Sequence, residues 1–486
     1  MKKTDITGSI NRNMQAITYV LFILIMLSSK ISSGVNGGDF VLSENDSISE
    51  AVLLLRDYVR IPSVTGHENK AAWFMASKCR QAGLIVNYIN DLPGSVNFTA
   101  SLYPLSYGKP NIVFHTHMDV VPPGDSTKWE HSPFGGTIDD GKVWGRGSMD
   151  NKGLAIIEFF AIKKFVAESY ERELPYNVTI LFVSGEETGG ITGSKIVSKN
   201  FLENFNPVLL IGEGGAGMKN IGFLSKKAPI FGISIIEKSN LWLKLSWKTD
   251  FAGHASIVEN NYASMLMING LYKLLNAPKP VIMTDEAALM FVSLGKVVGG
   301  IKGKMLLKPN SKIFKKLLYK FSKDDPEIRD LITNKITLTG FGGNSRGFNQ
   351  SSNTQSAFLD VRLLPGTEPK QIIDQIYSLI DDSVVKIEVL SRDASSKGTV
   401  PEYFYDCISD AIKKEYVGSA VIPMLLPAST DNNYYRSLGI PVYGINPMIV
   451  DPEQLKAIHN HDEYIKVIDI DKGIDVFSSF LRTVLN

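Results

Sequence analysis

The alternation of strand-like and helix-like segments between Asn111 and Gly212 is the feature that most constrains how this chain can fold. The short apolar runs NIVFH, NVTILFVS and NPVLLIG alternate with loops and with the longer helical runs GLAIIEFFAIKKFVAES and SKIVSKNFLEN. Such βαβ alternation predicts a mostly parallel sheet with helices on both faces, which is an α/β architecture. Functional side chains are expected where the parallel strands end.

The pattern changes after about Glu237. The segment NLWLKLSWKTD alternates apolar and polar residues, as a half-exposed antiparallel strand would. Further helix-like and strand-like segments follow, interrupted by a long insertion at residues 278–334. We therefore predict a smaller α+β domain at residues 239–393, inserted into a larger domain made of residues 47–238 and 394–486. A chain of 486 residues also exceeds the size that one hydrophobic core usually serves.

The composition limits which partners and which metal ligands are expected. The 51 Lys and Arg residues nearly balance the 50 Asp and Glu residues, so nothing in the overall charge favours nucleic acid as a partner. The two cysteines, Cys79 and Cys407, fit neither a disulfide framework nor a thiolate metal site, and buried free thiols are expected. Any metal must therefore be held by histidine and carboxylate side chains.

The N-terminus carries Lys2, Lys3 and Arg12, followed by the apolar run AITYVLFILIML at residues 16–27. This arrangement predicts a signal at residues 1–34, either a signal peptide cleaved after Gly34 or an uncleaved signal-anchor. In both cases the body is exported, and the protein would be secreted, periplasmic or anchored to a membrane with its body outside the cytoplasm.

A histidine and an aspartate end the first of these strands. His117 and Asp119 close the segment NIVFHTHMD, with one residue between them. A carboxylate at that spacing can hydrogen-bond the ring nitrogen that a metal leaves free, which fixes the tautomer of a metal-binding imidazole. The alternative is a polar loop in which both side chains only cap neighbouring backbone.

Further polar residues fall at other strand ends or in the loops that follow. Asp150 lies in the glycine-rich turn GRGSMDNKG, where it could instead be the N-cap of the next helix. Glu186 and Glu187 directly follow the strand NVTILFVS, and Glu213 follows NPVLLIG. Two adjacent carboxylates after a buried strand repel each other unless a cation or a proton separates them. His459 lies beyond the last strand, four residues before Glu463, and the two form a second imidazole–carboxylate pair.

Together these residues offer two imidazoles and three carboxylates as ligands: His117, Asp150, Glu187, Glu213 and His459. If Asp150 bridged two cations, each cation would have one histidine, one glutamate and the shared aspartate, with a position left for water. Three protein ligands plus water are typical of catalytic Zn²⁺. Mn²⁺ and Co²⁺ remain alternatives.

Seven motifs resemble one known family in their order along the chain. HMDVVPPG, WEHSPFGG, WGRGSMDNKG, VSGEETGG, GEGG, FAGHAS and IHNHDE are similar to motifs of the di-zinc metallopeptidases that include aminoacylase, acetylornithine deacetylase and carboxypeptidase S. The resemblance covers nearly the whole chain after about Ser47. The glutamate in GEGG and the insertion at residues 278–334 look most like the carboxypeptidase S branch, which includes secreted hydrolases of N-acyl amino acids.

The resemblance implies a role for each strand-end residue. His117 and Glu213 would hold one zinc, Glu187 and His459 the other, and Asp150 would bridge them. Asp119 would orient His117, and Glu186 would be the general base. His115 and His461 lie beside assigned ligands and are the alternatives to them.

The resemblance extends to the smaller domain, which is the lid in this family. His254 matches a histidine that stabilises the reacting carbonyl and is often supplied by a partner subunit, so a homodimer is one expected assembly. Asn349 and Arg362 match positions that hold the substrate carboxylate, a task that suits a guanidinium. The family often has Asn-Val-Ile-Pro where this chain has NQSS from Asn349 to Ser352, which is a departure in the local loop.

The expected function is therefore metal-dependent hydrolysis of the amide bond in N-acyl amino acids or in peptides with a free α-carboxylate. Metal-activated water would attack, with Glu186 as the base. The alternative from another class is a catalytically inactive binding protein that keeps the fold. Loss of Glu186 or of one ligand would indicate that alternative, and none of these residues is missing.

Overall fold

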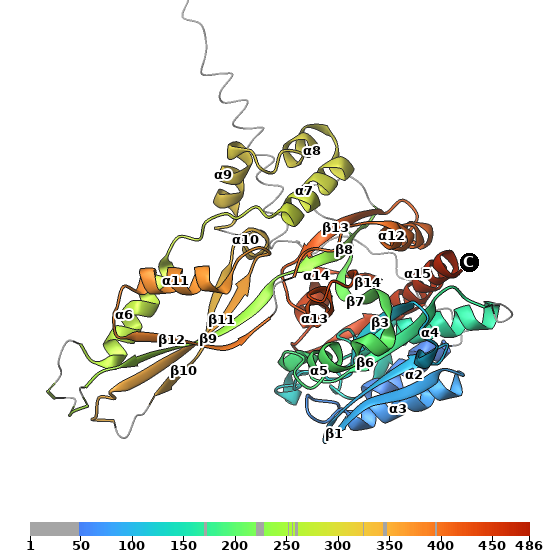
Figure 1. Cartoon of the computed structure of the whole chain (residues 1–486), viewed down its shortest axis with the longest axis horizontal. Helices are drawn as coiled ribbons and strands as arrows, with labels where there is room; N and C mark the ends of the chain where they lie inside the picture. The colour runs from blue at the N-terminus through green and yellow to red at the C-terminus, as the bar shows by residue number, and fades with distance from the viewer. Residues whose placement is uncertain are drawn as a thin grey trace, which may run out of the picture. The chain divides into compact units, whose positions relative to one another are not determined.

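The structure is a computed structural model that describes residues 48–169, 173–219, 228–250, 252–254, 256–257, 261–323, 325–343, 348–393 and 396–486 (Figure 1). The predicted signal at residues 1–34 lies outside the described residues. No helix of the described part is long and apolar enough to cross a membrane. Cys79 and Cys407 are free and buried, which confirms the expectation for the two thiols.

The chain divides into two compact units. The smaller unit comprises Ile236–Lys397 and Leu425–Ser429. The larger unit comprises the described residues from 48 to 235, together with Gly398–Met424 and Thr430–Asn486. The assignment of the smaller unit as a lid stays a prediction.

The larger unit is built on an eight-stranded sheet in which parallel strands form the centre. The strand order is β1-β2-β6-β3-β7-β14-β8-β13. The pairs β3–β6, β3–β7 and β7–β14 are parallel, whereas β1–β2, β2–β6 and β7–β8 are antiparallel. The bounds are β1 Ile85–Leu92, β2 Ser95–Ser101, β3 Asn111–His117, β6 Asn177–Val183, β7 Pro207–Met218, β8 Ile230–Glu237, β13 Ala420–Leu426 and β14 Val442–Ile449.

Helices pack on both faces of this sheet, which confirms the predicted α/β fold. Val113 of β3 belongs to a buried cluster with Val197 of helix α5 and Tyr435 of helix α13. The next residue, Phe114, contacts Phe477 of helix α15 edge-on, with ring centroids 5.1 Å apart. Successive residues of a strand point to opposite faces, so α5 and α13 cover one face and α15 the other. The helices of the unit are α2 Glu50–Val59, α3 Asn69–Gln81, α4 Lys152–Ser169, α5 Ser194–Asn200, α12 Tyr403–Glu415, α13 Asn432–Arg436, α14 Pro452–Ala457 and α15 Val467–Leu485.

A small antiparallel sheet completes the larger unit. It has the order β15-β5-β4, with β4 Thr137–Asp139, β5 Lys142–Trp144 and β15 Tyr464–Lys466. The pairing of β15 with β5 brings the segment after His459 beside the glycine-rich turn that contains Asp150.

The smaller unit has a four-stranded antiparallel sheet in the order β10-β11-β9-β12. Burial alternates along β9, where Leu241, Leu243, Leu245 and Trp247 pack into the core, as its sequence pattern predicts. Helices α6 and α11 cover that face. The bounds are β9 Ser239–Lys248, α6 Ala263–Asn276, β10 Lys335–Gly343, β11 Thr354–Leu363, α11 Pro369–Ile380 and β12 Val385–Arg392.

Four helices form the long insertion of the smaller unit. They are α7 Asp285–Val298, α8 Gly300–Leu306, α9 Lys312–Phe321 and α10 Pro326–Ile332.

One strand differs from its sequence pattern. Strand β7 does not end before Glu213 but continues to Met218, and its pairing with β14 is irregular between Gly212 and Gly215. Glycine permits this irregularity, because a Cβ atom on Gly214 would lie 2.7 Å from the Cα of Gly444 on β14. The apolar pattern predicted the start of the strand, whereas its glycine-rich second half carried no strand signal.

Candidate metal centre

His117 lies at the end of β3, with only 1% of its side chain exposed. Its Nδ1 lies 3.0 Å from the backbone oxygen of Asp119 and 3.5 Å from the carboxylate Oδ1 of the same residue. Its Nε2 lies 3.1 Å from Oδ1 of Asp150 and 3.7 Å from Oε2 of Glu213. One ring nitrogen is therefore held by the Asp119 segment, while the other faces the carboxylates, as a metal-binding imidazole requires.

The carboxylate of Asp119 holds the turn that follows β6. It accepts hydrogen bonds from the backbone N–H groups of Glu186 and Glu187 at 3.1 Å each, and from the hydroxyl of Thr65 at 2.8 Å. The sequence spacing indicated a contact between Asp119 and the His117 ring. The closest contact with the ring comes from the Asp119 carbonyl, and the carboxylate also fixes the two glutamates.

Asp150 lies between two imidazoles. Its Oδ1 is 3.1 Å from Nε2 of His117, and its Oδ2 is 3.2 Å from Nε2 of His459. The alternative role as an N-cap of α4 accounts for neither contact. One carboxylate whose two oxygens face different imidazoles has the arrangement of a bridging ligand.

Glu463 holds the turn that carries Asp150. Its Oε1 accepts from the backbone N–H groups of Met149 and Asp150 at 3.0 and 3.1 Å, and its Oε2 is 2.7 Å from Nη1 of Arg146. Arg146 and Glu463 are 2% and 1% exposed. The sequence showed Glu463 as a possible partner of His459, but the structure assigns it to the Asp150 turn.

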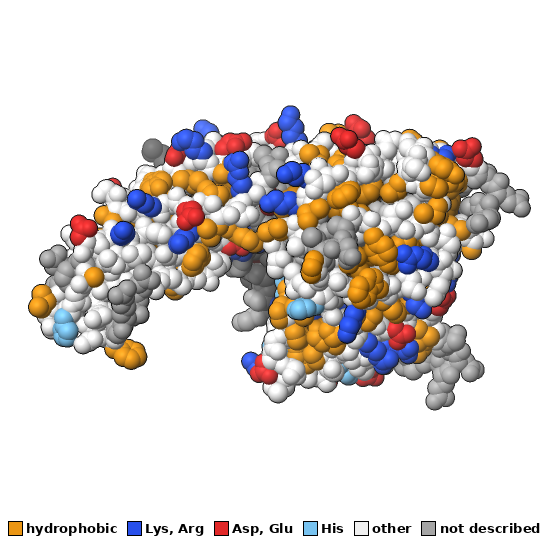
Figure 2. Space-filling view, turned by 60° about the horizontal axis from the view of Figure 1, so that its bottom comes forward, with side chains coloured by type: hydrophobic (Ala, Val, Ile, Leu, Met, Phe, Trp, Pro, Cys, Tyr) orange, Lys and Arg blue, Asp and Glu red, His pale blue; other side chains and the backbone are white. Residues whose placement is uncertain are grey.

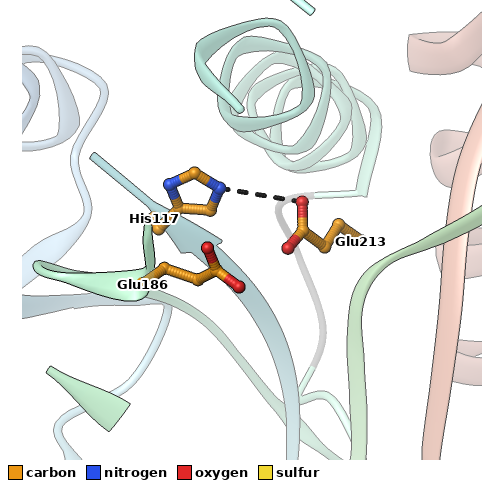
Figure 3. A group of neighbouring side chains, drawn as sticks. All are labelled: His117, Glu186 and Glu213. Atoms are coloured by element: carbon orange, nitrogen blue, oxygen red, sulfur yellow. Dashed lines mark ion pairs between the residues drawn. The ribbon is translucent and has the colours of Figure 1, made fainter. Parts of the chain in front are cut away.

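Glu186 and Glu187 form a short 3₁₀ turn after β6, and their side chains lie in different places. Glu187 Oε2 is 3.0 Å from Nε2 of His459, and its other oxygen is buried with no hydrogen-bond partner among the described residues. Glu186 groups with His117 and Glu213, with one ligand atom of each within 4.8 Å of the others (Figure 3). His117, Asp150 and Glu187 form a second such group.

Glu213 projects from the irregular part of β7 toward His117 (Figure 3). The side-chain amide of Asn151 donates to its Oε2 at 2.8 Å. Asn151 was not singled out from the sequence, although its place directly after Asp150 was the available signal.

Burial and charge shift the pKa values of this cluster strongly. Burial alone would lower the pKa of His117, but hydrogen bonds with Asp119, Asp150 and Glu213 raise it well above its ordinary value. Hydrogen bonds with Asp150 and Glu187 raise the pKa of His459 to about 10. Burial, followed by the charge of Glu213, raises the pKa of Glu186 well above its ordinary value. Such a density of carboxylates is stabilised by positive charge, either protons on the imidazoles or a bound cation.

These residues fit a metal. Imidazole and carboxylate are the ligands that zinc accepts, and each cation can obtain more than two of them here. The buried Oε1 of Glu187 has no hydrogen-bond partner among the described residues, and a cation would satisfy it.

The two alternative histidines lie elsewhere. His115 is buried, with Nε2 2.7 Å from the hydroxyl of Ser194, and burial lowers its pKa to about 3. His461 contacts the ring of Trp129 edge-on, with centroids 6.1 Å apart. Among the described residues, neither ring lies within 4.0 Å of a carboxylate oxygen of Asp150, Glu187 or Glu213, whereas the rings of His117 and His459 do.

Asp431 is a residue that the sequence analysis missed. It is 3% exposed, lies 4.0 Å from His115, and has its pKa raised to about 8 by burial. It follows strand β13, so the same strand-end rule could have found it.

The residues predicted on the smaller unit form their own group. The side-chain amide of Asn349 lies 3.2 Å from Nε2 of His254, and the hydroxyl of Ser256 lies 2.7 Å from Nδ1. Arg362 on β11 instead forms an ion pair with Asp360, with Nε 3.0 Å from Oδ1. The structure thus brings His254 and Asn349 together and leaves Arg362 with a different partner.

Comparisons with known proteins identify relatives that are similar over most of the chain. The chain is 26% identical to the probable carboxypeptidase S-like 2 of Dictyostelium discoideum over 375 residues, covering 76% of this chain and 71% of the relative. It is 24% identical to mouse aminoacylase-1 over 449 residues, covering 90% of this chain and 96% of the relative.

The fold is similar to that of a metallo-carboxypeptidase from Sulfolobus solfataricus, with a TM-score of 0.66 at 19% identity, covering 89% of this chain and 99% of that chain. The model of peptidase family M20/M25/M40 matches residues 113–483, which is more than half of the chain. This match confirms the family resemblance found in the motifs: the chain belongs to peptidase family M20/M25/M40, a family of metal-dependent hydrolases.

Proposed function

We propose that this protein hydrolyses the amide bond of N-acyl amino acids or of peptides with a free α-carboxylate, using water activated between two bound cations. One observation carries the two-cation proposal: each carboxylate oxygen of Asp150 faces a different imidazole, at 3.1 and 3.2 Å. A single-cation site would need only one side of this carboxylate.

The contacts divide the ligands into two sets that share Asp150. His117 and Glu213 complete the first set, and Glu187 and His459 complete the second. Zn²⁺ suits these ligands, and Mn²⁺ and Co²⁺ are the alternatives. When bound, the cations would lower the pKa of a shared water and polarise the substrate carbonyl.

Glu186 is the proposed general base. Glu186 is not needed as a ligand when Glu213 and Glu187 each complete one of the two ligand sets. Its carboxylate nevertheless lies beside His117 and Glu213. Without cations, burial and the charge of Glu213 raise the pKa of Glu186 well above its ordinary value. Bound cations would offset the repulsion from Glu213 and favour the ionised carboxylate that a general base needs. It would take the proton of the attacking water and later deliver it to the leaving amine.

His254 is the proposed donor to the reacting carbonyl oxygen. Its Nδ1 accepts a hydrogen bond from the backbone N–H of Ser256 at 3.2 Å, so the neutral ring carries its proton on Nε2. The side-chain nitrogen of Asn349 lies 3.2 Å from Nε2 and is also a donor, so it cannot accept this proton. The Nε2–H group would then be left to donate to a developing oxyanion.

Arg362 is the proposed partner of the substrate carboxylate. Its Nε and Nη2 bond to Asp360, and this leaves Nη1 to form a charge-assisted hydrogen bond with a ligand. The names of the two relatives, a carboxypeptidase S-like protein and an aminoacylase, support a substrate with an amino-acid end.

The test is a hydrolysis assay over N-acyl amino acids and dipeptides, each as the free acid and as the methyl ester, with and without a chelator. We expect activity on the acids that chelation abolishes and added metal restores, and we expect Arg362→Ala to remove the preference for the acid. Losing a charge-assisted hydrogen bond should cost about 1.5–3 kcal/mol in kcat/KM.

The matched control is Arg392→Ala, which removes an arginine from β12 of the same sheet. Equal rates on acids and esters would contradict the carboxylate requirement. Tight binding of the substrates without turnover by the metal-loaded protein would instead indicate the alternative, an inactive binding protein.

A further inference from the structure

Helices α7, α8 and α9 carry a concentration of positive charge that the rest of the chain lacks. Residues 287–323 contain nine lysines and no arginine, aspartate or glutamate, and the acidic residues of α7, Asp285 and Glu286, lie just before this segment. Without these nine, the 51 Lys and Arg residues fall to 42 against 50 Asp and Glu, so the rest of the chain has a net charge of −8. Figure 2 shows one face of the molecule, on which Lys and Arg side chains lie among Asp and Glu side chains.

These lysines are not neutralised within the described part of the chain. No ion pair there involves any of them, whereas the neighbouring Lys335 pairs with Asp330 at 2.7 Å and Lys370 pairs with Asp374 at 2.6 Å. Seven of the nine, including Lys304 and Lys316, are exposed. Their positive charge is therefore directed to solvent.

The packing places α8 and α9 on one side of α7. The ring of Phe291 on α7 contacts that of Phe314 on α9, with centroids 5.4 Å apart. Gly295 on α7 meets Gly303 on α8 so closely that a Cβ on Gly303 would lie 2.4 Å from the Gly295 oxygen. Phe291 and Gly295 are four residues apart, so they lie on the same face of α7, and α8 and α9 both pack against that face (Figure 1). The faces of α8 and α9 that point away from α7 are called their outer faces.

The outer face of α9 is both basic and apolar. Phe314, Leu317, Leu318 and Phe321 point inward, so Lys312, Lys316 and Lys320, at intervals of four residues, lie on the exposed side. Ile313 on the first turn of the same helix is 76% exposed.

The outer face of α8 has the same character. Gly303 and Leu306 are buried, while Lys304 is exposed and Ile301 is 79% exposed. Lys308, just after the end of the helix, is also exposed. Highly exposed isoleucines beside unpaired lysines are costly in water and are typical of helices that lie in a membrane interface.

We propose that the outer faces of α8 and α9 form a docking surface for an anionic lipid bilayer. Charge complementarity selects the partner, because a segment with nine lysines and no acidic residue is attracted to acidic lipid headgroups. The exposed Ile301 and Ile313 favour a bilayer over a soluble polyanion, because they can enter its hydrocarbon boundary.

The test is flotation of the full-length protein with vesicles of phosphatidylcholine alone and with about 30% phosphatidylserine, at low and physiological salt. The measured quantity is the increase in partitioning that phosphatidylserine causes. The N-terminus, with Lys2, Lys3, Arg12 and the apolar run at residues 16–27, would contribute equally to every variant, so the comparison between variants isolates the contribution of α8 and α9. Lys312→Glu, Lys316→Glu and Lys320→Glu together should reduce this increase by about 100-fold or more, since each lysine near such a surface contributes about fivefold.

A matched control reverses three exposed lysines elsewhere, Lys195 and Lys199 on α5 and Lys386 on β12, and changes the net charge equally. It should keep most of the phosphatidylserine-dependent binding. An equal loss in both triple variants, or no dependence on phosphatidylserine in the unaltered protein, would overturn the proposal. If the glutamates disturb folding, measured by circular dichroism, the same lysines replaced by glutamine decide the question in the same way.

The isoleucines separate a bilayer from a soluble polyanion. Ile301→Ser with Ile313→Ser should weaken the phosphatidylserine-dependent vesicle binding at least about tenfold and leave binding to heparin, a soluble polyanion, within about twofold. Suppose that the double isoleucine variant bound vesicles and heparin as the unaltered protein does, while the triple lysine variant bound neither. The surface would then be a site for soluble polyanions, and the bilayer proposal would be wrong.

Discussion

Replacement of Glu463 by glutamine is the most informative test of how the metal centre is held. The carboxylate is 1% exposed and forms an ion pair at 2.7 Å with Arg146, which is itself 2% exposed. Glutamine has nearly the same shape but no charge. If its oxygen keeps the N–H groups of Met149 and Asp150, its amide nitrogen must face the Arg146 guanidinium, which is also a donor.

The expected cost follows from this geometry. Removal of one partner from a buried ion pair costs about 3–5 kcal/mol because the other charge stays buried without compensation. The turn that positions Asp150 should also loosen, and the loss of a group that orients a metal ligand lowers metal affinity by about 10–100-fold. We therefore expect Glu463→Gln to lower both the free energy of unfolding of the metal-free protein and the affinity for zinc.

Urea unfolding followed by circular dichroism and competition of zinc with a chromophoric chelator measure the two effects. Glu453→Gln, at an exposed position on α14, is the matched control and should leave both unchanged. Arg146→Met combined with Glu463→Met should cost less than the sum of the single changes, because neither charge remains unpaired. A loss of less than about 1 kcal/mol in Glu463→Gln would refute this account of the ion pair.

Three further predictions concern the chemistry and the pH dependence. Glu186→Gln should keep its metal and lose about 10²–10⁴-fold in kcat, whereas Glu187→Gln should lose metal affinity. Metal analysis and steady-state kinetics measure the two effects, and the reverse pattern would mean that the roles of the two glutamates are exchanged. His254→Ala should lower kcat by about 10²–10³-fold with KM and metal content little changed, and mixing it with Glu186→Gln subunits restores part of the activity only if the histidine acts across a dimer. Burial lowers the pKa of Lys238 from 10.5 to about 8, so between these values the unfolded chain binds the extra proton and the free energy of unfolding rises with pH. From pH 8 to 10.5, the free energy of unfolding of the unaltered protein should therefore rise by about 2–3 kcal/mol relative to that of Lys238→Met. A difference between the two proteins that does not change with pH in urea titrations would contradict this prediction.

Much of the fold follows from periodicity in the sequence. The apolar runs that became β3 and β6 are buried along their whole length, so their composition alone identifies them as central strands. The alternation in β9 records a sheet with one buried face. The second half of β7 could not be predicted, because its glycines pack closely against distant segments, Gly214 against Gly444 on β14 and Gly215 against Gly232 on β8.

The site residues that lie at strand ends could be predicted from the sequence. The contacts that join distant segments of the chain could not. His117 and Glu187 could be selected from their positions after buried strands. The contact of Glu463 with the Asp150 turn joins residues more than 300 positions apart, and no local pattern records it. The same holds for the backbone hydrogen bonds that Asp119 accepts from the turn after β6.

The number of metal ions bound per chain tests the central proposal most directly. The purified protein is reconstituted with zinc, freed of excess metal, and measured by inductively coupled plasma mass spectrometry against protein concentration. A bridging Asp150 between His117 and His459 predicts two ions per chain in the unaltered protein, and a lower content in Asp150→Ala. One ion or none per chain in active protein would contradict the two-cation site.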